Sequence, residues 1–140
     1  MKKYFEKVLT DGWEGIYLEE WDLDSDALVG AQTPPWSFRK YTLVGGKQHG
    51  VDVVEINNGH MTITIVPTRG MNVLSAYTED ASLGWDSPVE QVVHPSFVDA
   101  ESRGGLGFLE GMNEMICRCG LENTGAPEEE DGVKLPLHGR

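Results

Sequence analysis

The stretch VDVVEINNGHMTITIV, residues 51–66, decides the fold of this 140-residue chain. In its second half, HMTITIV, apolar residues alternate with threonines, which is the period-two pattern of a half-buried strand. Asn58-Gly59 supplies the positive φ that a hairpin turn requires. The stretch therefore predicts two antiparallel strands, Val51–Asn57 and His60–Val66, joined by a tight turn.

Similar strand signals lie on both sides of this hairpin. Phe38–Val44 precedes it and Val73–Tyr77 follows it, and no helical stretch separates them. This order is typical of an antiparallel meander and not of βαβ units. Further on, Met115–Leu121 and the run that starts at Val133 also read as strands, whereas residues 1–37 show no clean period and read as an irregular lead-in.

Composition and charge limit the possible partners. Hydrophobic residues make up 39% of the chain, which is a globular composition, and the net charge is −12. Because phosphate contacts need a basic patch, this charge argues against nucleic acid and anionic membrane surfaces. No apolar run approaches the ~20 residues of a membrane span, and the first residues lack the apolar core of a secretory signal. We expect a cytoplasmic protein with no nucleic-acid or membrane partner.

Two cysteines, Cys117 and Cys119, stand one residue apart. On a strand their backbones are separated by ~6.6 Å, near the limit of disulfide reach and with poorly directed side chains. We expect reduced thiols with a structural role. A metal site is the less favoured alternative, because no partner ligands for it are evident, so no metal is predicted.

The segment Leu83–Met115 is rich in Gly and Pro, with irregularly spaced aromatic residues. A segment of this length without regular structure is usually a functional loop in a compact domain. The acidic run Glu128–Asp131 reads as a solvated face and not as a metal cradle. In the turn PTRGMN, Arg69-Gly70 is expected to serve turn geometry, with Gly70 in the left-handed region.

Six pieces in fixed order carry a family resemblance: VPTRGM, LGWDSP, VHPSFVD, GGLGFLEGMNEM, RCGLENTGAP and LPLHGR. From about Gly46 to Arg140 this string resembles a little-characterised branch of the aldose 1-epimerase-like, or galactose mutarotase-like, proteins. The resemblance implies an all-β fold, an antiparallel β-sandwich that holds a monosaccharide or sugar phosphate in a cleft. It implies one incomplete domain over residues 1–140, with the sheet and cleft loops in residues 38–140, no cofactor, and a homodimer as one possible assembly.

The resemblance also assigns two site residues. RCG followed by LPLHGR is similar to the pattern RGG…HG.AR of hexose-6-phosphate epimerase relatives. It implies that Arg118 binds the substrate and that His138 lies at the reacting end of the sugar as a catalytic residue. The spacer between them departs from the relatives' pattern, so the sequence does not assign a phosphate to Arg118. The alternatives are a salt bridge from Arg118 to Glu114 or Glu122, and a structural His138 that caps a strand end.

Four further residues are candidate substrate ligands. The indole of Trp85 can stack on a sugar face and Asp86 can accept from hydroxyls, although Trp85 also suits a core position. His94, held extended by the following proline, can line the pocket from the long loop. Glu114, with its neighbour Asn113, can reach the cleft or lie in a solvated turn.

The predicted chemistry is anomer exchange. A base removes the C1 hydroxyl proton and an acid protonates the ring oxygen, after which the ring opens, rotates and closes. The family's second histidine and its glutamate base lie downstream of the HG motif, where this sequence has no residues, so we expect the N-terminal part of a longer enzyme. A non-catalytic carbohydrate-binding protein of the same fold is the alternative. A cupin is disfavoured because the four histidines, at positions 49, 60, 94 and 138, include no closely spaced pair.

Overall fold

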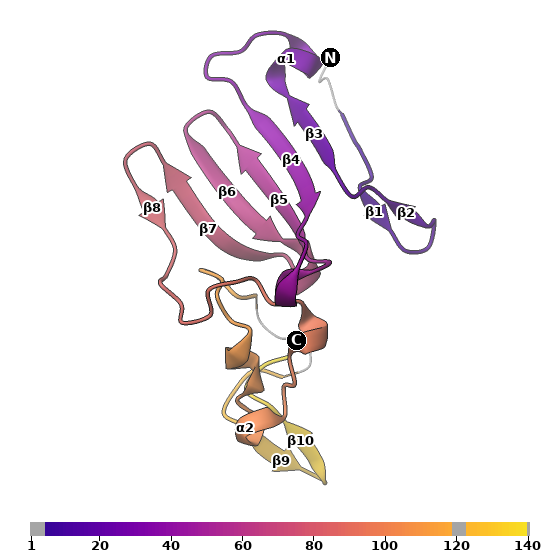
Figure 1. The fold of residues 1–140 in the computed structure, drawn as a ribbon, viewed down its shortest axis with the longest axis vertical. Helices are drawn as coiled ribbons and strands as arrows, with labels where there is room; N and C mark the ends of the chain where they lie inside the picture. Colours follow the sequence, from indigo (N-terminus) through magenta and orange to yellow (C-terminus); the bar gives the residue numbers. More distant parts are fainter. Residues whose placement is uncertain (1–4, 119–122, 140) are drawn as a thin grey trace.

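The computed structural model describes residues 5–118 and 123–139, and its main element is a six-stranded antiparallel sheet (Figure 1). Every strand pairs with its neighbour in the chain, so the sheet is a simple meander. The predicted all-β antiparallel fold is confirmed, and so are both strands of the central hairpin. In order, the strands are β3 (Trp21–Asp24), β4 (Ser37–Thr42), β5 (Asp52–Asn57), β6 (Met61–Val66), β7 (Asn72–Thr78) and β8 (Ser82–Leu83).

Short elements surround this sheet. Two small hairpins are formed by β1 (Thr10–Asp11) with β2 (Ile16–Tyr17), and by β9 (Glu128–Glu130) with β10 (Val133–Leu135). The three glutamates of β9 are exposed, which agrees with the prediction that Glu128–Asp131 is a solvated face. The helical elements are α1 (Ser25–Val29), α2 (Ser102–Gly105), and the 3-10 turns η1 (Gly46–Gln48), η2 (Pro67–Arg69), η3 (Pro95–Phe97) and η4 (Gly107–Glu110).

The sheet begins earlier than the sequence indicates. Residues 1–37 read as an irregular lead-in, but Trp21–Asp24 pairs along its length with β4, from Trp21 opposite Lys40 to Asp24 opposite Ser37. The expectation is therefore wrong for these four residues. Their apolar and acidic residues do alternate, but four residues are too few for a period to stand out among the surrounding acids.

The turn between β5 and β6 explains the glycine in Asn58-Gly59. Gly59 has φ +89°, the left-handed conformation that was predicted. A Cβ at this position would also lie 2.3 Å from Pro34 Cβ and 2.6 Å from the carbonyl oxygen of Pro35. Glycine is therefore required both by the backbone and by the loop that packs against the turn.

The two faces of the sheet differ in chemistry. One face carries a row of apolar residues that are partners across four strands, Phe38, Ile56, Ile63 and Ala76. The opposite face carries polar residues with long side chains, Arg39, Tyr41, Glu55, Asn57 and Tyr77, together with the two threonines of β6. Contrary to the usual rule, Thr62 and Thr64 are only 6% exposed, whereas Ile56 on the apolar face is 38% exposed.

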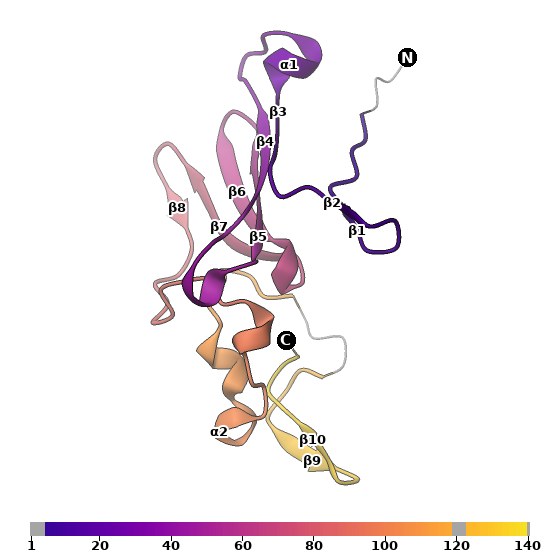
Figure 2. The same cartoon turned by 45° about the vertical axis from the view of Figure 1, so that its right-hand side comes forward.

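The N-terminal segment packs on part of the apolar face (Figure 2). Lys40, which is buried on this face, forms an ion pair with Asp52 at 2.8 Å. The Tyr17 hydroxyl donates to the same Asp52 oxygen at 2.9 Å, and the Tyr17 ring lies 4.6 Å from the Lys40 ammonium. Phe5 stacks on Trp21 in the same region. The first hairpin thus packs against the buried Lys40–Asp52 ion pair, which no sequence motif predicts.

The segment after β8 forms an irregular layer at one end of the sheet (Figure 1). A backbone bridge between Val73 and Ile116 joins this layer to β7. A small core of Val51, Val66 and Val92 lies at the junction, with Leu43 and Leu74 packed against it. Met115–Leu121, predicted as a strand, makes this single bridge at Ile116 within its described residues, and 119–122 lie outside them. No helix in the described part of the chain is long and apolar enough to cross a membrane.

Candidate functional site

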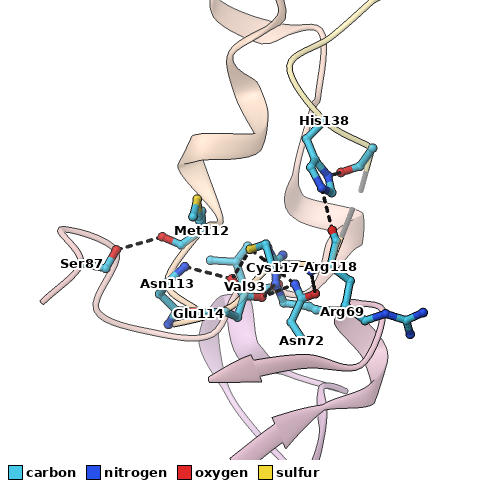
Figure 3. A network of polar contacts seen from close by, with 11 residues as sticks. Arg69, Asn72, Ser87, Val93, Met112, Asn113, Glu114, Cys117, Arg118 and His138 are labelled. Atoms are coloured by element: carbon cyan, nitrogen blue, oxygen red, sulfur yellow. Dashed lines mark hydrogen bonds and ion pairs between the residues drawn. The ribbon is translucent and has the colours of Figure 1, made fainter. Parts of the chain in front are cut away.

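The site is built on the turn Pro67–Asn72 between β6 and β7. Gly70 and Met71 both have positive φ, +70° and +63°, so the backbone reverses sharply over two residues. The predicted left-handed conformation of Gly70 is confirmed. The turn places the side chains of Arg69 and Asn72 under the irregular layer, where both are buried (Figure 3).

Arg69 forms a buried ion pair with Glu114, which the sequence did not indicate. The Arg69 Nε donates to Glu114 Oε1, and Arg69 Nη1 donates to the carbonyl oxygen of Val93 at 2.9 Å. Arg69 is 5% exposed and Glu114 is 0% exposed. A Cβ on Gly111 would lie 3.2 Å from Arg69 Nη1, so a glycine gives the guanidinium the space that it occupies.

Both carboxylate oxygens of Glu114 accept hydrogen bonds from more than one group. Oε1 also accepts from Asn72 Nδ2 at 3.2 Å, and Oε2 accepts from the Asn113 backbone N–H at 3.1 Å. Burial by itself would raise the pKa of Glu114, but the hydrogen bonds from Arg69 and Asn72 and the Arg69 charge outweigh it and hold the pKa below its usual value. Glu114 therefore lies beneath the site as a buried carboxylate, and the solvated-turn alternative is wrong.

Cys117 packs against the same carboxylate. Its Sγ lies 3.8 Å from Glu114 Oε2 and 3.7 Å from Asn72 Nδ2. Burial, reinforced by the Glu114 charge, raises the pKa of the Cys117 thiol to about 11. Cys117 is a free thiol, as expected, whereas Cys119 lies outside the described residues. Within 5–118 and 123–139 no group of His, Cys, Asp and Glu could hold a metal ion.

Arg118 and His138, the two residues assigned by resemblance, are in contact. His138 Nε2 donates to the Arg118 carbonyl oxygen at 2.8 Å (Figure 3). The Arg118 N–H donates to Asn72 Oδ1 at 2.9 Å, and its Nη1 donates to the carbonyl oxygen of Gly70 at 3.1 Å. The alternative in which Arg118 pairs with Glu114 is wrong, because Arg69 takes that position, and Glu122 lies outside the described residues.

The His138 ring is enclosed on one face and at both nitrogens. It stacks on Phe108, with 4.4 Å between ring centroids and 23° between planes, and Nδ1 lies 2.7 Å from the carbonyl oxygen of Gly139. Carbonyl oxygens only accept, so a ring nitrogen that forms a hydrogen bond at either contact must carry the proton. The geometry at each nitrogen is therefore that of a donor directed at a backbone carbonyl.

The remaining predicted ligands lie elsewhere in the irregular layer. Trp85 is 47% exposed, so the core alternative for it is wrong, and Asp86 beside it is exposed. His94 caps η3, with Nδ1 bonded to Ser96, and its backbone N–H donates to the Lys47 carbonyl. His94 thus stabilises its own loop and Trp85 and Asp86 are exposed, whereas Glu114, Arg118 and His138 belong to one connected cluster.

Sequence reasoning missed three members of that cluster, Arg69, Asn72 and Phe108. Arg69 and Phe108 lie inside the family pieces VPTRGM and GGLGFLEGMNEM, and Asn72 is the last residue of the turn PTRGMN; these pieces are the only signal that could have pointed to them. The roles of Arg69 and Asn72 depend on contacts between residues 42 to 46 positions apart, which join the turn to Glu114 and Arg118.

The fold of the chain is that of an aldose 1-epimerase-like protein. The chain belongs to the family described as "Domain of unknown function (DUF4432)", whose model matches residues 48–140. It is also similar to the crystal structure of a "putative aldose 1-epimerase" from Klebsiella pneumoniae subsp. pneumoniae MGH 78578, with 46% sequence identity and a TM-score of 0.90. The match covers 96% of this chain but only 35% of that chain. No curated protein matches the sequence.

Proposed function

We propose that the protein is a sugar isomerase that interconverts the α and β anomers of an aldose by acid–base ring opening. The observation that supports it best is the placement of His138 beside Arg118, in a chain whose fold is that of an aldose 1-epimerase-like protein. The description of the Klebsiella structure as a "putative aldose 1-epimerase" supports the same reaction class.

In this proposal His138 is the acid. A ring nitrogen that carries a proton can donate it to the sugar's ring oxygen once it exchanges its backbone carbonyl for the substrate. The exposed guanidinium of Arg118, held at one nitrogen by Gly70, has other N–H groups to offer to hydroxyl or phosphate oxygens. Phe108 keeps the imidazole plane fixed while the proton moves.

Ring opening also needs a base at the C1 hydroxyl. The resemblance places that carboxylate downstream of the HG motif. We propose that it belongs to the part of a longer chain that corresponds to the remainder of the Klebsiella structure. Glu114 is not suited to the task, because its carboxylate is buried and accepts from four groups.

A carbohydrate-binding protein without catalysis is the second candidate. It is favoured by one observation: both nitrogens of His138 contact backbone carbonyls, as they would in a histidine that only holds the chain in place. A protein of this kind would use Arg118 to bind the sugar and would leave the anomers at their spontaneous rate.

Exchange NMR on the whole protein with a panel of aldoses separates the two candidates. An isomerase speeds anomer exchange, and His138→Ala lowers that rate by about 10²–10⁴-fold, the usual contribution of one acid–base group. His60→Ala, in the exposed β5–β6 turn, is the control and should keep the wild-type rate. Saturation transfer without faster exchange would support the binding protein, and neither signal with any aldose would refute both candidates.

A further inference from the structure

We propose that Asn72 is a positioning residue that sets the orientation of His138 through the backbone of Arg118. The inference rests on the proposed function, since it names what holds the acid of that reaction in place. It assigns a task to a buried polar residue that no motif explains. Three consecutive hydrogen bonds support the inference: from Asn72 to Glu114, from Arg118 to Asn72, and from His138 to Arg118.

The first link fixes the side-chain amide of Asn72. Its Nδ2 faces Glu114 Oε1 at 3.2 Å, and that carboxylate is in turn bound by Arg69. An ionised carboxylate only accepts hydrogen bonds, so the nitrogen and not the oxygen of the amide must face it. The orientation of Asn72 therefore follows from the buried ion pair, and its Oδ1 is directed to the opposite side.

The second link joins Asn72 to Arg118. The directed Oδ1 accepts the Arg118 N–H at 2.9 Å, and the Gly70 carbonyl of the same turn accepts from Arg118 Nη1 at 3.1 Å. One turn thus holds Arg118 by its backbone and by its side chain. The left-handed residues at 70 and 71 make this possible, because they bring both acceptors to the same side.

The third link passes from Arg118 to His138. The Arg118 carbonyl can only accept, so His138 Nε2 carries a proton and points at it, at 2.8 Å (Figure 3). Phe108 restricts the tilt of the ring. A shift of the Arg118 backbone therefore moves its carbonyl oxygen, and with it the direction in which His138 Nε2 points its proton.

A matched variant separates positioning from general stability. Asn72→Ala removes the side-chain donor bonds to Glu114 and, more weakly, to Cys117, and one acceptor bond from a backbone N–H. Asn57→Ala in β5 removes the same two kinds of bond, to Thr62 and from the Gly59 N–H, far from the cluster in the chain. Asn72→Asp keeps an acceptor for the Arg118 N–H but replaces the donor that faces Glu114 by a second carboxylate, so it tests the coupling between the two readouts and not a rescue.

Two readouts are measured on the whole protein labelled with ¹⁵N. They are hydrogen exchange of the Arg118 amide and the ¹⁵N chemical shifts of the His138 ring nitrogens. We expect Asn72→Ala to lose protection at Arg118 and to shift the His138 signals, and Asn57→Ala to change neither. In Asn72→Asp the two readouts should change together, whatever the size of the change. Where anomer exchange is measurable, Asn72→Ala should lower kcat by about 10²-fold with little change in KM, the typical effect of a small misplacement.

The coupling itself is the test. If the His138 signals stay in place in any folded variant that has lost Arg118 protection, the inference is overturned. It is also overturned if Asn57→Ala shifts the His138 signals as much as Asn72→Ala does. If Asn72→Ala does not fold, Asn72→Asp decides alone, because its His138 signals must follow its Arg118 protection. The NMR arm needs no catalysis, so a lack of isomerase activity would refute the proposed function and leave this measurement intact.

Discussion

Glu114 has no solvent-exposed surface, so the free energy of its charge depends on the groups that surround it. Arg69, Asn72, the Asn113 backbone and Cys117 all direct donors at its two oxygens. A buried ion pair of this kind adds little net stability compared with apolar residues, but the loss of one partner leaves the other charge buried and unpaired. The cluster should therefore respond strongly to single substitutions.

The first prediction is that Glu114→Ala lowers the free energy of unfolding by about 3–5 kcal/mol, because it leaves the Arg69 charge uncompensated. Urea denaturation monitored by tryptophan fluorescence measures it. Glu129→Ala, on the exposed strand β9, should stay within about 0.5 kcal/mol of wild type. An equal effect of the two substitutions would show that the ion pair does not stabilise the fold.

The second prediction concerns acid. The folded pKa of Glu114 is depressed, so its stabilisation is present above the pKa of the unfolded chain, ~4.3, and is lost as the pH falls through the folded pKa. Unfolding curves between neutral pH and acid should show a smaller acid loss in Glu114→Gln than in wild type. Some loss should remain, because Asp52 also has a depressed pKa: hydrogen bonds from Lys40, Thr42 and Tyr17 outweigh its burial. Identical acid profiles would contradict the assignment.

The third prediction is that Cys117 alkylates slowly. With a thiol pKa of about 11 instead of an ordinary ~8.5, the reactive thiolate at pH 8 is roughly 10²-fold scarcer. Iodoacetamide labelling followed by peptide mass spectrometry, with the urea-unfolded chain as reference, measures the ratio. Glu114→Gln should speed the reaction, since the carboxylate charge contributes to the raised pKa. Equal rates in the folded and unfolded chains would refute the raised pKa of this partly buried thiol.

At the scale of elements, the sequence pattern predicted the strands and turns that depend only on adjacent residues. The central hairpin is specified by β-branched alternation and by a glycine with positive φ, and both are properties of adjacent residues. Strand β3 was missed because its four residues give too short a period. Arg118 and His138 were assigned to one site only through family resemblance, and their direct contact was not predicted. Arg69 and Asn72 were not placed, because their roles depend on how a turn meets a distant layer.

The fourth prediction tests how the β5–β6 turn is held. Gly132→Ala, outside this turn, is the control. Gly132 has φ +78° and open space around it, so the substitution should lower the free energy of unfolding only by the left-handed strain, about 1–2 kcal/mol. Gly59→Ala has similar strain at φ +89° and must also displace Pro34 and Pro35, which adds about 1–3 kcal/mol. Chemical denaturation of both variants gives the difference. Equal losses would mean that the proline loop moves away freely and does not fix the turn.

At the scale of the molecule, the sheet has an unusual distribution of burial. The threonines of β6 are covered by long neighbours on the polar face, whereas the apolar face is only partly covered by the N-terminal segment. The alternation in β6 predicted the strand but not which face lacks a cover, because burial depends on what packs over a sheet. In a sandwich that cover is a second sheet, and the matched region is 35% of the Klebsiella chain.

The last prediction follows from that face. Ile56 is 38% exposed and Leu83, on the two-residue edge strand β8, is 54% exposed, and apolar surface beside an open edge recruits other chains. The 140 residues expressed alone should self-associate despite a net charge of −12, which opposes aggregation. Light scattering after size-exclusion chromatography measures this. Ile56→Lys should shift the chain toward monomer, whereas Glu55→Lys, on the opposite face, should not. A sharp monomer peak for the unaltered chain, with protected amides from Val51 to Tyr77, would show that the apolar face needs no further cover.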